Sequence, residues 1–257
     1  MGNQLTRDGV NSSQTRQDYT NLQNMGSQYA DLAVDAGLAA AGALPPPFGT
    51  AADLGSLGRS LWRGDWGGAL LDAVGIIPIF GDGAKAAKIA DRLNDLRKSI
   101  DVTSTAVARA FNQTRATATK YWDDIVQANR QKWQDALAKC GGTQACKDAA
   151  ALQKGPQYKN TPTSDKGSWN PPEGRGDGVF TPDNGGPPIT YKNGFPDYSS
   201  HSVADVDIPM TGNRTTDFDL ADEAMLAKDP NWQKPSGYTW HHHEDGVTMQ
   251  LIPTNIH

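Results

Sequence analysis

The sequence predicts an α+β protein in three parts, and three observations support this fold class. Residues 1–155 are rich in alanine and glycine and contain apolar residues at helical spacing. Residues 156–194 are dense in proline and glycine, as linkers often are. Residues 195–257 hold two short strand-like runs followed by a helix start. We therefore predict an all-α N-terminal region, a Pro/Gly-rich linker and a small domain with a hairpin and a helix.

The charge is unevenly distributed along the chain. The 257 residues suffice for one large domain or two modest ones, and the formal net charge is −5. Residues 156–257 contain 14 acidic and 7 basic side chains, whereas residues 1–155 contain 15 and 17. An acidic C-terminal part is unfavourable for binding a polyanion unless a metal ion supplies positive charge.

The first helices are interrupted by proline and glycine. Small residues from about Asp18 to Ala43 predict a helix that must end at the three prolines 45–47. The uncharged apolar run 73–81 is shorter than the roughly 20 residues that span a bilayer. Because Asp72 and Asp82 bracket this run, we predict a buried helical hairpin.

Three more helices are expected before the linker. A charged helix runs from Ala84 to about Ile100, and a third, short helix runs from about Cys146 to Leu152, where Gly155 and Pro156 stop it. The helix between them is marked by large apolar residues on one face: Trp122, Ile125, Val126, Trp133 and Leu137.

The two cysteines leave two alternatives open. Cys140 and Cys146 enclose a glycine-containing loop, which fits either a local disulfide or two free thiols. No apolar core follows Met1 to Asp8, so no signal peptide is visible. If the protein is exported, we expect a dedicated export system.

The predicted linker has no room for a regular element, because prolines and glycines recur throughout it. It includes the triplet Arg175-Gly176-Asp177, which matches an adhesion tripeptide. A match of three residues in a glycine-rich segment is expected by chance.

The C-terminal part regains regular structure. Val203 to Ile208 alternates as a short strand, and Thr216 or Asp217 is expected to cap a helix that ends near Lys228. Two further strand-like runs, 238–244 and 247–252, are joined through Asp245-Gly246, a dipeptide suited to a tight turn. Thr254 or Asn255 then predicts the start of a helix whose first turn contains His257.

All five histidines lie in the last quarter of the chain, and His241, His242 and His243 are consecutive. Histidine both binds transition metals and transfers protons near neutral pH, so this cluster is the candidate site. Adjacent residues of a strand face opposite ways, and His241 and His242 therefore cannot both bind one ion. One should bind the metal and the other should face the substrate.

The segment Trp240-His241-His242, with Glu244-Asp245, residues 249–253 and Ile256-His257, resembles the WHH branch of the HNH and endonuclease VII superfamily. These ββα-metal nucleases are C-terminal toxin domains of bacterial polymorphic toxins. Segments 195–198, 206–214 and 217–218 resemble the lead-in to the histidine motif, so the resemblance covers 195–257. Residues 64–88 are similar to apolar pre-toxin regions, which makes residues 1–155 a helical pre-toxin or translocation region by resemblance.

The resemblance implies a role for each histidine of the motif. His242 would be the general base, and His241 and His257 would ligate one divalent ion: Zn, Ni or Mn in preference to Mg. Trp240 is expected to pack beneath the hairpin. His243 either polarises the scissile phosphate or is exposed and uninvolved. His201 belongs to the lead-in loop.

Two further expectations concern residues outside this motif. Arg214 is a candidate phosphate contact. In the family the helix continues past the position of His257 and supplies another metal ligand. We therefore expect a domain truncated at its C-terminus, with a metal site that is completed by water or not at all.

These roles imply an antibacterial toxin effector that is a metal-dependent endonuclease of low sequence specificity, with DNA favoured over RNA as substrate. A cognate immunity protein, secretion machinery or a carrier protein, and action in the cytoplasm of a target cell are expected with it. Two alternatives remain. One is a membrane-active or translocation protein that touches the membrane transiently through its N-terminal half, and the other is a metal-binding interaction module without turnover.

Overall fold

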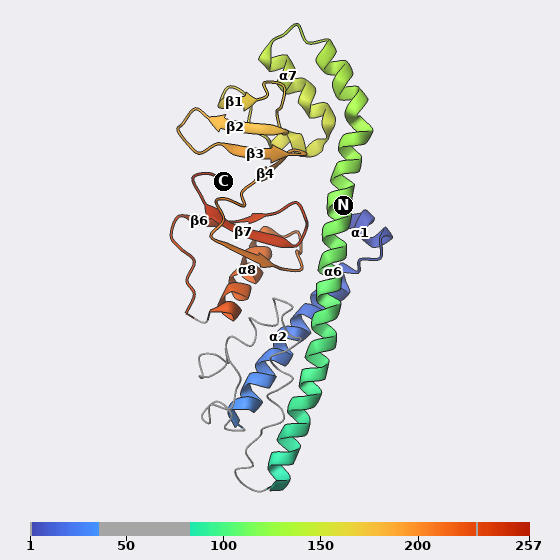
Figure 1. Ribbon diagram of the computed structural model, residues 1–257, viewed down its shortest axis with the longest axis vertical. Coiled ribbons are helices and arrows are strands. Elements are labelled where there is room, and N and C mark those ends of the chain that lie inside the picture. Colours follow the sequence, from blue (N-terminus) through green and yellow to red (C-terminus); the bar gives the residue numbers. More distant parts are fainter. Residues whose placement is uncertain (1, 36–82, 230) are drawn as a thin grey trace. The chain divides into compact units, whose positions relative to one another are not determined.

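The computed structural model describes residues 2–35, 83–229 and 231–257 (Figure 1). Helices dominate its first half, and seven strands follow with one helix among them, which confirms the α+β prediction at this level. The predicted apolar hairpin around residues 73–81 and the end of the first long helix lie outside the described residues.

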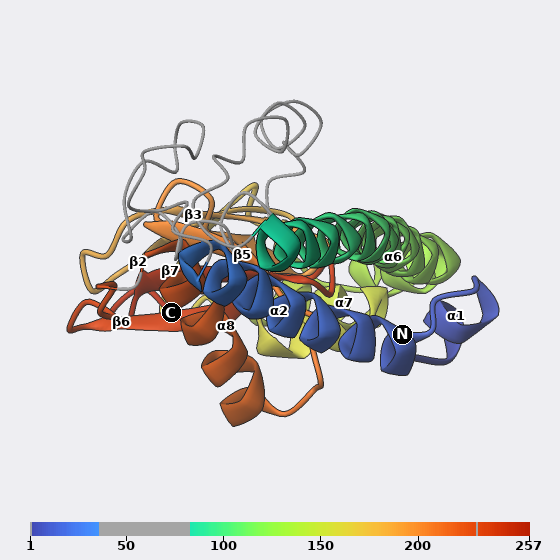
Figure 2. The ribbon, with the colours of Figure 1, turned by 90° about the horizontal axis from the view of Figure 1, so that it is seen from below.

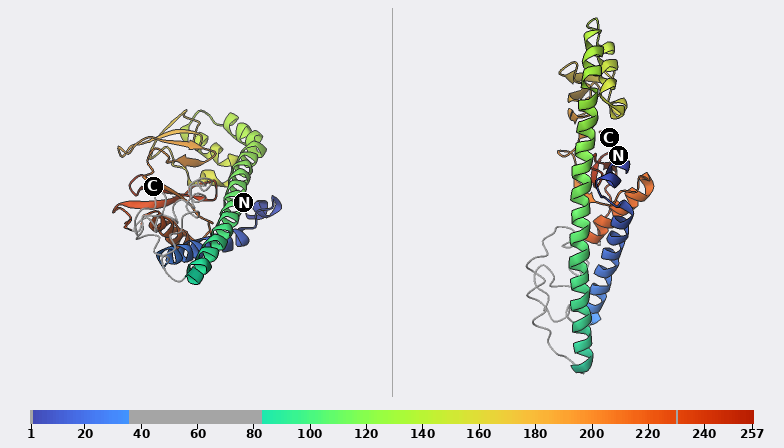
Figure 3. Two further views of the ribbon diagram at one scale, coloured as in Figure 1. Left: turned by 60° about the horizontal axis from the view of Figure 1, so that its bottom comes forward. Right: turned by 90° about the vertical axis from the view of Figure 1, so that its right-hand side faces the viewer.

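The helices before the strands are α1 (Gly2–Arg7), α2 (Ser12–Asp35), α6 (Gly83–Ala138) and α7 (Gln144–Ala151). The prediction of two separate helices between residues 84 and 137 is wrong, because α6 is a single helix of 56 residues (Figure 3). Its sequence contains no proline, and no glycine after Gly83, so nothing in it forces a break.

The chain divides into two compact units. The second unit comprises residues 9–113 and 207–234 and includes α2, the first half of α6 and α8 (Arg214–Lys228). Figure 2 shows α2 between α6 and α8. The buried Tyr19 of α2 lies 6.3 Å from the ring of Phe111 in α6, which fixes this part of the helical core.

Asn213, and not Thr216 or Asp217, is the N-cap of α8. Its Oδ1 accepts a hydrogen bond from the backbone N of Thr216 at 3.1 Å. Asp217 is completely buried and accepts hydrogen bonds from the backbone N and the hydroxyl of Thr211, both at 2.7 Å. The predicted N-cap is therefore wrong by a few residues. Asp217 has a residue type that is common at N-caps, but its side chain instead accepts hydrogen bonds from the preceding loop.

The first unit comprises residues 1–8, 114–206 and 235–257 and holds two sheets (Figure 1). The four-stranded antiparallel sheet has the order β1 (Gly167–Asn170), β2 (Gly178–Pro182), β3 (Ile189–Lys192) and β4 (Phe195–Asp197). The three-stranded sheet has the order β5 (Ala204–Asp207), β7 (Thr248–Pro253) and β6 (Tyr238–His242). The strand predicted at 203–208 and the C-terminal hairpin are both confirmed.

The expectation that residues 156–194 contain no regular element is wrong. This segment forms β1, β2 and β3 after the 3-10 helices Leu152–Lys154 and Pro156–Asn160. The turns use the glycines: Asn193 and Gly194 both have positive φ and close the two-residue hairpin between β3 and β4. The buried residues Trp169 and Phe180 lie opposite each other on β1 and β2. Short strands with a buried apolar residue therefore alternate with the turns that contain proline and glycine.

The triplet 175–177 is structural. Arg175 is buried and donates hydrogen bonds to Thr161 and to the carbonyl of Asp148. Asp177 accepts hydrogen bonds from Lys154, Tyr158 and the backbone N of Asn193 at 2.7–2.8 Å. A buried arginine with three hydrogen bonds is not available as an adhesion motif.

The second half of α6 packs against β4 and against the turn between β6 and β7. The ring of Trp122 lies 5.0 Å from that of Phe195 at the start of β4, and its Nε1 donates to the carbonyl of Glu244 at 3.3 Å. Asn193 donates to Asp123 at 2.5 Å. Trp122 was predicted as a core residue, and it contacts the hairpin turn that follows the histidines.

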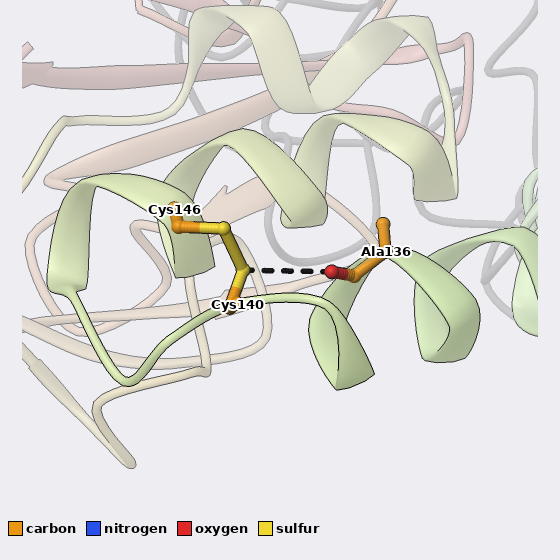
Figure 4. Close-up of a disulfide and its surroundings, with 3 residues drawn as sticks. All are labelled: Ala136, Cys140 and Cys146. Carbon is orange, nitrogen blue, oxygen red and sulfur yellow. Dashed lines mark hydrogen bonds between the residues drawn. A yellow bond between two sulfur atoms is a disulfide. The ribbon is translucent and has the colours of Figure 1, made fainter.

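Cys140 and Cys146 form a disulfide between the end of α6 and α7, which settles the alternative that the spacing leaves open (Figure 4). The Sγ atom of Cys140 lies 3.5 Å from the carbonyl oxygen of Ala136.

No helix among the described residues is both long and apolar enough to cross a membrane. The assignment of residues 1–155 to translocation stays a prediction.

Candidate active site

Strand β6 carries the first two histidines of the cluster. It pairs with β7 in antiparallel register, with Trp240 opposite Leu251, His241 opposite Gln250 and His242 opposite Met249. Opposite residues share a face, so His242 lies on the face of Trp240 and His241 lies on the other. The alternation expected from the strand pattern is therefore present.

The turn between the strands is organised by Asp245. Its carboxylate accepts hydrogen bonds from the backbone N of Val247 and of Thr248 at 3.0 and 2.9 Å, and from the Thr248 hydroxyl at 2.7 Å. Arg115 of α6 donates its Nε to the same carboxylate at 3.1 Å. Burial raises the pKa of Asp245, but hydrogen bonds from His243, Thr248 and Val247 outweigh burial and hold this pKa well below its usual value.

The last residues of the chain return to the start of β6. Residues 254–256 form a turn after β7 and not the helix that the sequence predicts. The backbone N of Thr254 donates to the carbonyl of Gly237 at 2.8 Å, and that of Ile256 donates to Pro253 at 3.2 Å. The backbone N–H groups of Thr254 and Ile256 therefore donate to carbonyls of a turn, whereas a helix start would have required a capping side chain for such groups.

This turn brings His257 to His241. The Nδ1 atom of His241 lies 3.3 Å from the Nε2 atom of His257. The ring of Tyr198 contacts His241 edge to face, with 4.9 Å between ring centroids, and its hydroxyl donates to the carbonyl of Ile256 at 3.2 Å. Tyr198 thus holds one histidine through its ring and positions the other through the backbone.

His241 is neutral at the pH of the cell. Burial lowers its pKa to about 3, with further lowering from His257, His243 and His242. A neutral imidazole keeps a ring nitrogen free to bind a metal, since a protonated ring has no lone pair to donate. The environment therefore favours the form of His241 that a metal ion requires.

The spacing of the two rings fits a shared ion. Two nitrogen ligands at about 2.0–2.1 Å from a tetrahedral ion are separated by about 3.3 Å, and the two ring nitrogens of His241 and His257 lie at this separation. Within the described part of the chain, no cluster of three or more His, Cys, Asp or Glu side chains forms a metal site. The ring nitrogens of His241 and His257 are therefore donors of two residues that could hold an ion, and the binding of a metal stays a prediction.

Both histidines line a cavity of about 590 Å³ between the two sheets, and His242 lines it as well. Its walls include four aromatic rings and four side-chain amides, contributed by Phe180, Tyr191, Phe195, Tyr198, Gln157, Asn160, Asn184 and Asn255. Three histidine residues therefore contribute to the lining of one concave site, and metal-assisted or acid–base chemistry uses such sites.

His243 is placed differently. Its backbone N donates to the carbonyl of Thr248 at 3.0 Å, and its ring lies 3.4 Å from a carboxylate oxygen of Glu244 and 3.5 Å from one of Asp245. A hydrogen bond with Asp245 raises the pKa of His243 despite the opposing effect of burial. This histidine stabilises the turn and is not among the described residues that line the cavity.

Three other residues singled out from the sequence do not contact the pair His241 and His257 in the hydrogen bonds and ring contacts described above: Trp240, Arg214 and His201. Trp240 is fully buried, which is the environment of a packing residue. Arg214 begins α8 in the other compact unit, where its guanidinium lies 5.0 Å from the centre of the Phe218 ring. His201 lies in the loop between β4 and β5, and its backbone N donates to the carbonyl of Tyr198 at 2.8 Å. The phosphate role of Arg214 stays a prediction.

Sequence reasoning missed several residues of the site. Tyr198 lies in the segment 195–198 that the resemblance covers. The resemblance included this residue, but no contact between it and the histidines was predicted. Arg115 and Gln157 gave no signal, since one is a helix arginine and the other lies in the segment expected to be a linker. Their contacts depend on the tertiary fold alone.

Comparison with known proteins bears on residues 188–257, which match the family model of the DNase/tRNase domain of colicin-like bacteriocins. The matched range begins at β3 and includes all five histidines. No curated protein and no solved structure matches the chain. The match confirms the expected toxin and nuclease character and leaves DNA and tRNA open as substrates. The C-terminal part of the chain is thus similar to the nuclease domain of a bacterial toxin.

Proposed function

We propose that this protein is an antibacterial toxin whose C-terminal domain is a metal-dependent endonuclease of the WHH type in the HNH and endonuclease VII superfamily. The observation that carries the proposal is the approach of His241 to His257 beside His242 in one cavity. The match of residues 188–257 to colicin-like nuclease domains supports it independently. DNA is the first substrate to test, and RNA the second.

His241 and His257 are the proposed ligands of one divalent ion, with Zn, Ni and Mn fitting imidazole donors better than Mg. Such an ion, when bound, neutralises negative charge on the scissile phosphate and on the leaving oxygen. Residues 156–257 contain 14 acidic and only 7 basic side chains. The positive charge of an ion would therefore help this acidic part of the chain to bind a phosphate.

His242 is the proposed general base. Its imidazole removes a proton from a water molecule as the water oxygen attacks phosphorus. The new P–O bond forms while the bond to the leaving oxygen breaks, and the leaving oxygen then takes a proton from solvent. His242 fits this role because it lines the cavity of the histidine pair but lies on the opposite face of β6 from His241.

Partners follow from this activity. A nuclease that acts in the cytoplasm of a target cell endangers its producer, so a cognate immunity protein is part of the proposal. Delivery by a dedicated secretion system or a carrier protein completes it, with residues 1–155 as the translocation region.

The test is cleavage of plasmid DNA and of RNA by the purified full chain, with each metal added or with a chelator. We expect metal-dependent cleavage, reduced about 100-fold or more in His242→Ala, since a general base contributes roughly 10²–10⁴ in rate. His201→Ala is the matched control and should cleave as the unmodified chain does. Inertness of the unmodified chain toward both polymers with every metal would contradict the nuclease proposal.

A further inference from the structure

Helix α6 contacts the two hairpins that border the cavity. The contacts come from its second half, residues 114–138, which belong to the first compact unit. Two of its side chains contact the turn between β6 and β7, and two contact the hairpin of β3 and β4. The match to toxin nuclease domains covers residues 188–257 and does not include this helix. Whether α6 serves the site therefore depends on what these contacts hold in place.

Trp122 joins two walls of the cavity. Its indole Nε1 donates to the carbonyl oxygen of Glu244 at 3.3 Å, two residues after His242. Its ring lies 5.0 Å from the ring of Phe195, at an interplanar angle of 61°. His242 and Phe195 both line the cavity. One half-buried side chain therefore contacts a wall residue directly and also the backbone that follows the proposed base.

Neighbouring side chains of α6 add a contact to each hairpin. Arg115 lies seven residues before Trp122, which is two helical turns, so both side chains project from the same face of the helix. The Nε atom of Arg115 donates to the carboxylate of Asp245 at 3.1 Å. On the other wall, Asp123 accepts a hydrogen bond from the side chain of Asn193 in the turn between β3 and β4. Both hairpins are thus bound to one continuous helix.

The position of one hairpin relative to the other matters for the proposed chemistry. A general base must lie within about 2.6–3.2 Å of the group whose proton it removes. His241 and His257 are held by Tyr198 and by the terminal turn, and the contacts of α6 fall on the segment after His242. A displacement of about 1 Å at a reacting group can reduce the rate about 100-fold. A contact that sets the position of β6 can therefore control kcat without touching the substrate.

We propose that Trp122 is a positioning residue of the nuclease site, which holds the β6 hairpin and its His242 against the cavity wall formed by β4. Arg115 acts on the same turn through Asp245. The active site then includes α6 and is not confined to residues 188–257. This inference rests on the proposed nuclease function of the histidines.

Cleavage kinetics of the full chain compare Trp122→Phe with Trp133→Phe on DNA and on RNA. Phenylalanine keeps a ring beside Phe195 but has no N–H group to donate to Glu244. We expect kcat to fall about tenfold or more in Trp122→Phe and KM to change less than about twofold, because the contact aligns the base and does not bind the substrate.

Trp133→Phe is the matched control. Trp133 is another half-buried tryptophan of α6, and its buried Nε1 has no hydrogen-bond partner among the described residues. The same substitution therefore removes no hydrogen bond there, and this variant should cleave as the unmodified chain does.

The same substitution in a chain that carries His242→Ala separates positioning from general support of the fold. Trp122→Phe should not reduce the residual cleavage further, because Trp122 acts through His242. An equal reduction in both backgrounds would overturn the inference. Arg115→Gln is the second variant, for use if Trp122→Phe does not fold, and its effect on kcat should depend on His242 in the same way.

A measurement without metal keeps this inference separate from the nuclease proposal. The histidine rings are labelled with ¹³C and observed by NMR on the chelator-treated chain, and the His242 signal is identified by its loss in His242→Ala. Trp122→Phe should shift this signal more than it shifts the signal of His201, and Trp133→Phe should leave both in place.

The two measurements together distinguish the proposals. If the chain cuts nucleic acid and Trp122→Phe leaves kcat unchanged, the positioning role is wrong and the nuclease stands. If the chain cuts neither polymer but the His242 signal shifts as expected, the positioning of His242 stands and the nuclease function is wrong. If there is no cleavage and no shift, both are wrong.

Discussion

The Nδ1 atom of His241 lies 3.3 Å from the Nε2 atom of His257, although the two residues are 16 positions apart. Two hydrogen bonds to backbone carbonyls bring them together: the backbone N of Thr254 donates to Gly237, just before β6, and the hydroxyl of Tyr198 donates to Ile256. The buried side of this turn packs on Ile252 and Tyr198. The proposed ligand pair is therefore held by the fold before any ion binds.

The first prediction concerns this pair. His257→Ala should weaken binding of zinc or nickel at least about tenfold, because one of two protein ligands is lost. Its stability without metal should not change, since the His257 side chain is exposed. Isothermal titration calorimetry on the chelator-treated protein measures the affinity, and thermal unfolding measures the stability.

His201→Ala is the control for this measurement, because it removes a histidine of the same domain that belongs to the loop after Tyr198. It should bind metal as the unmodified chain does. Equal affinity of the His257→Ala variant and the unmodified chain would show that His257 is not a ligand.

The second prediction concerns the turn after the histidines. Asp245→Asn should destabilise the protein by about 1–3 kcal/mol at pH 7, since the carboxylate accepts charge-assisted hydrogen bonds from Arg115 and hydrogen bonds from Thr248. The folded state holds the pKa of Asp245 below its unfolded value of about 3.9. The stabilisation is therefore present above this value and is lost as the pH falls through the lower folded pKa.

Urea denaturation at pH 7 and at pH 3 measures this difference. The gap between the unmodified chain and Asp245→Asn should be smaller at pH 3, where protonation removes part of the advantage of the carboxylate. The exposed Asp183→Asn is the control, with no expected difference at either pH. An unchanged gap would mean that the charge of Asp245 does not contribute.

Local patterns in the sequence were sufficient to predict several elements of this fold. The alternation on β6 separated His241 from His242, and the Asp245-Gly246 turn gave the hairpin within a residue or two. These features depend on near neighbours in sequence, so periodicity and turn chemistry report them. The proximity of His241 and His257 was expected only through the resemblance, and the turn that produces it is not the expected helix.

Other features depend on contacts between distant segments and escaped prediction. Proline and glycine between residues 156 and 194 indicated a linker, but they form the tight turns of a four-stranded sheet. The unpaired amide of Gln157 is invisible in sequence, because only the fold shows that no partner reaches it. Tertiary packing decides both cases.

The third prediction concerns the ion pair of Lys154 and Asp177. The Lys154 side chain is 5% exposed, its Nζ lies 2.8 Å from Asp177, and it also lies 4.1 Å from the centre of the Trp133 ring. Lys154→Met should cost roughly 2 kcal/mol, less than for a fully buried pair, because Asp177 is 32% exposed and keeps its hydrogen bond from Tyr158.

Urea denaturation of Lys154→Met, Asp177→Asn and the double variant gives the coupling energy, expected to be about 1–2 kcal/mol. Lys159→Met, at an exposed position of the next 3-10 helix (Pro156–Asn160), is the matched control and should leave stability unchanged. Strictly additive single effects would show that the pair contributes nothing beyond its separate contacts.

The fourth prediction concerns the disulfide between Cys140 and Cys146. The bond closes a short loop, with a sequence separation of 6, between α6 and α7. Replacing both cysteines by serine should destabilise the first compact unit by about 2 kcal/mol, as expected from the entropy that such a loop removes from the unfolded chain. Reduction of the unmodified protein with dithiothreitol should lower its thermal midpoint by as much as the double substitution does. The double-serine variant should not respond to the reductant, and a response of equal size there would place the effect elsewhere. If neither reduction nor substitution changes the midpoint, the connection between the two helices is held by packing and not by the bond.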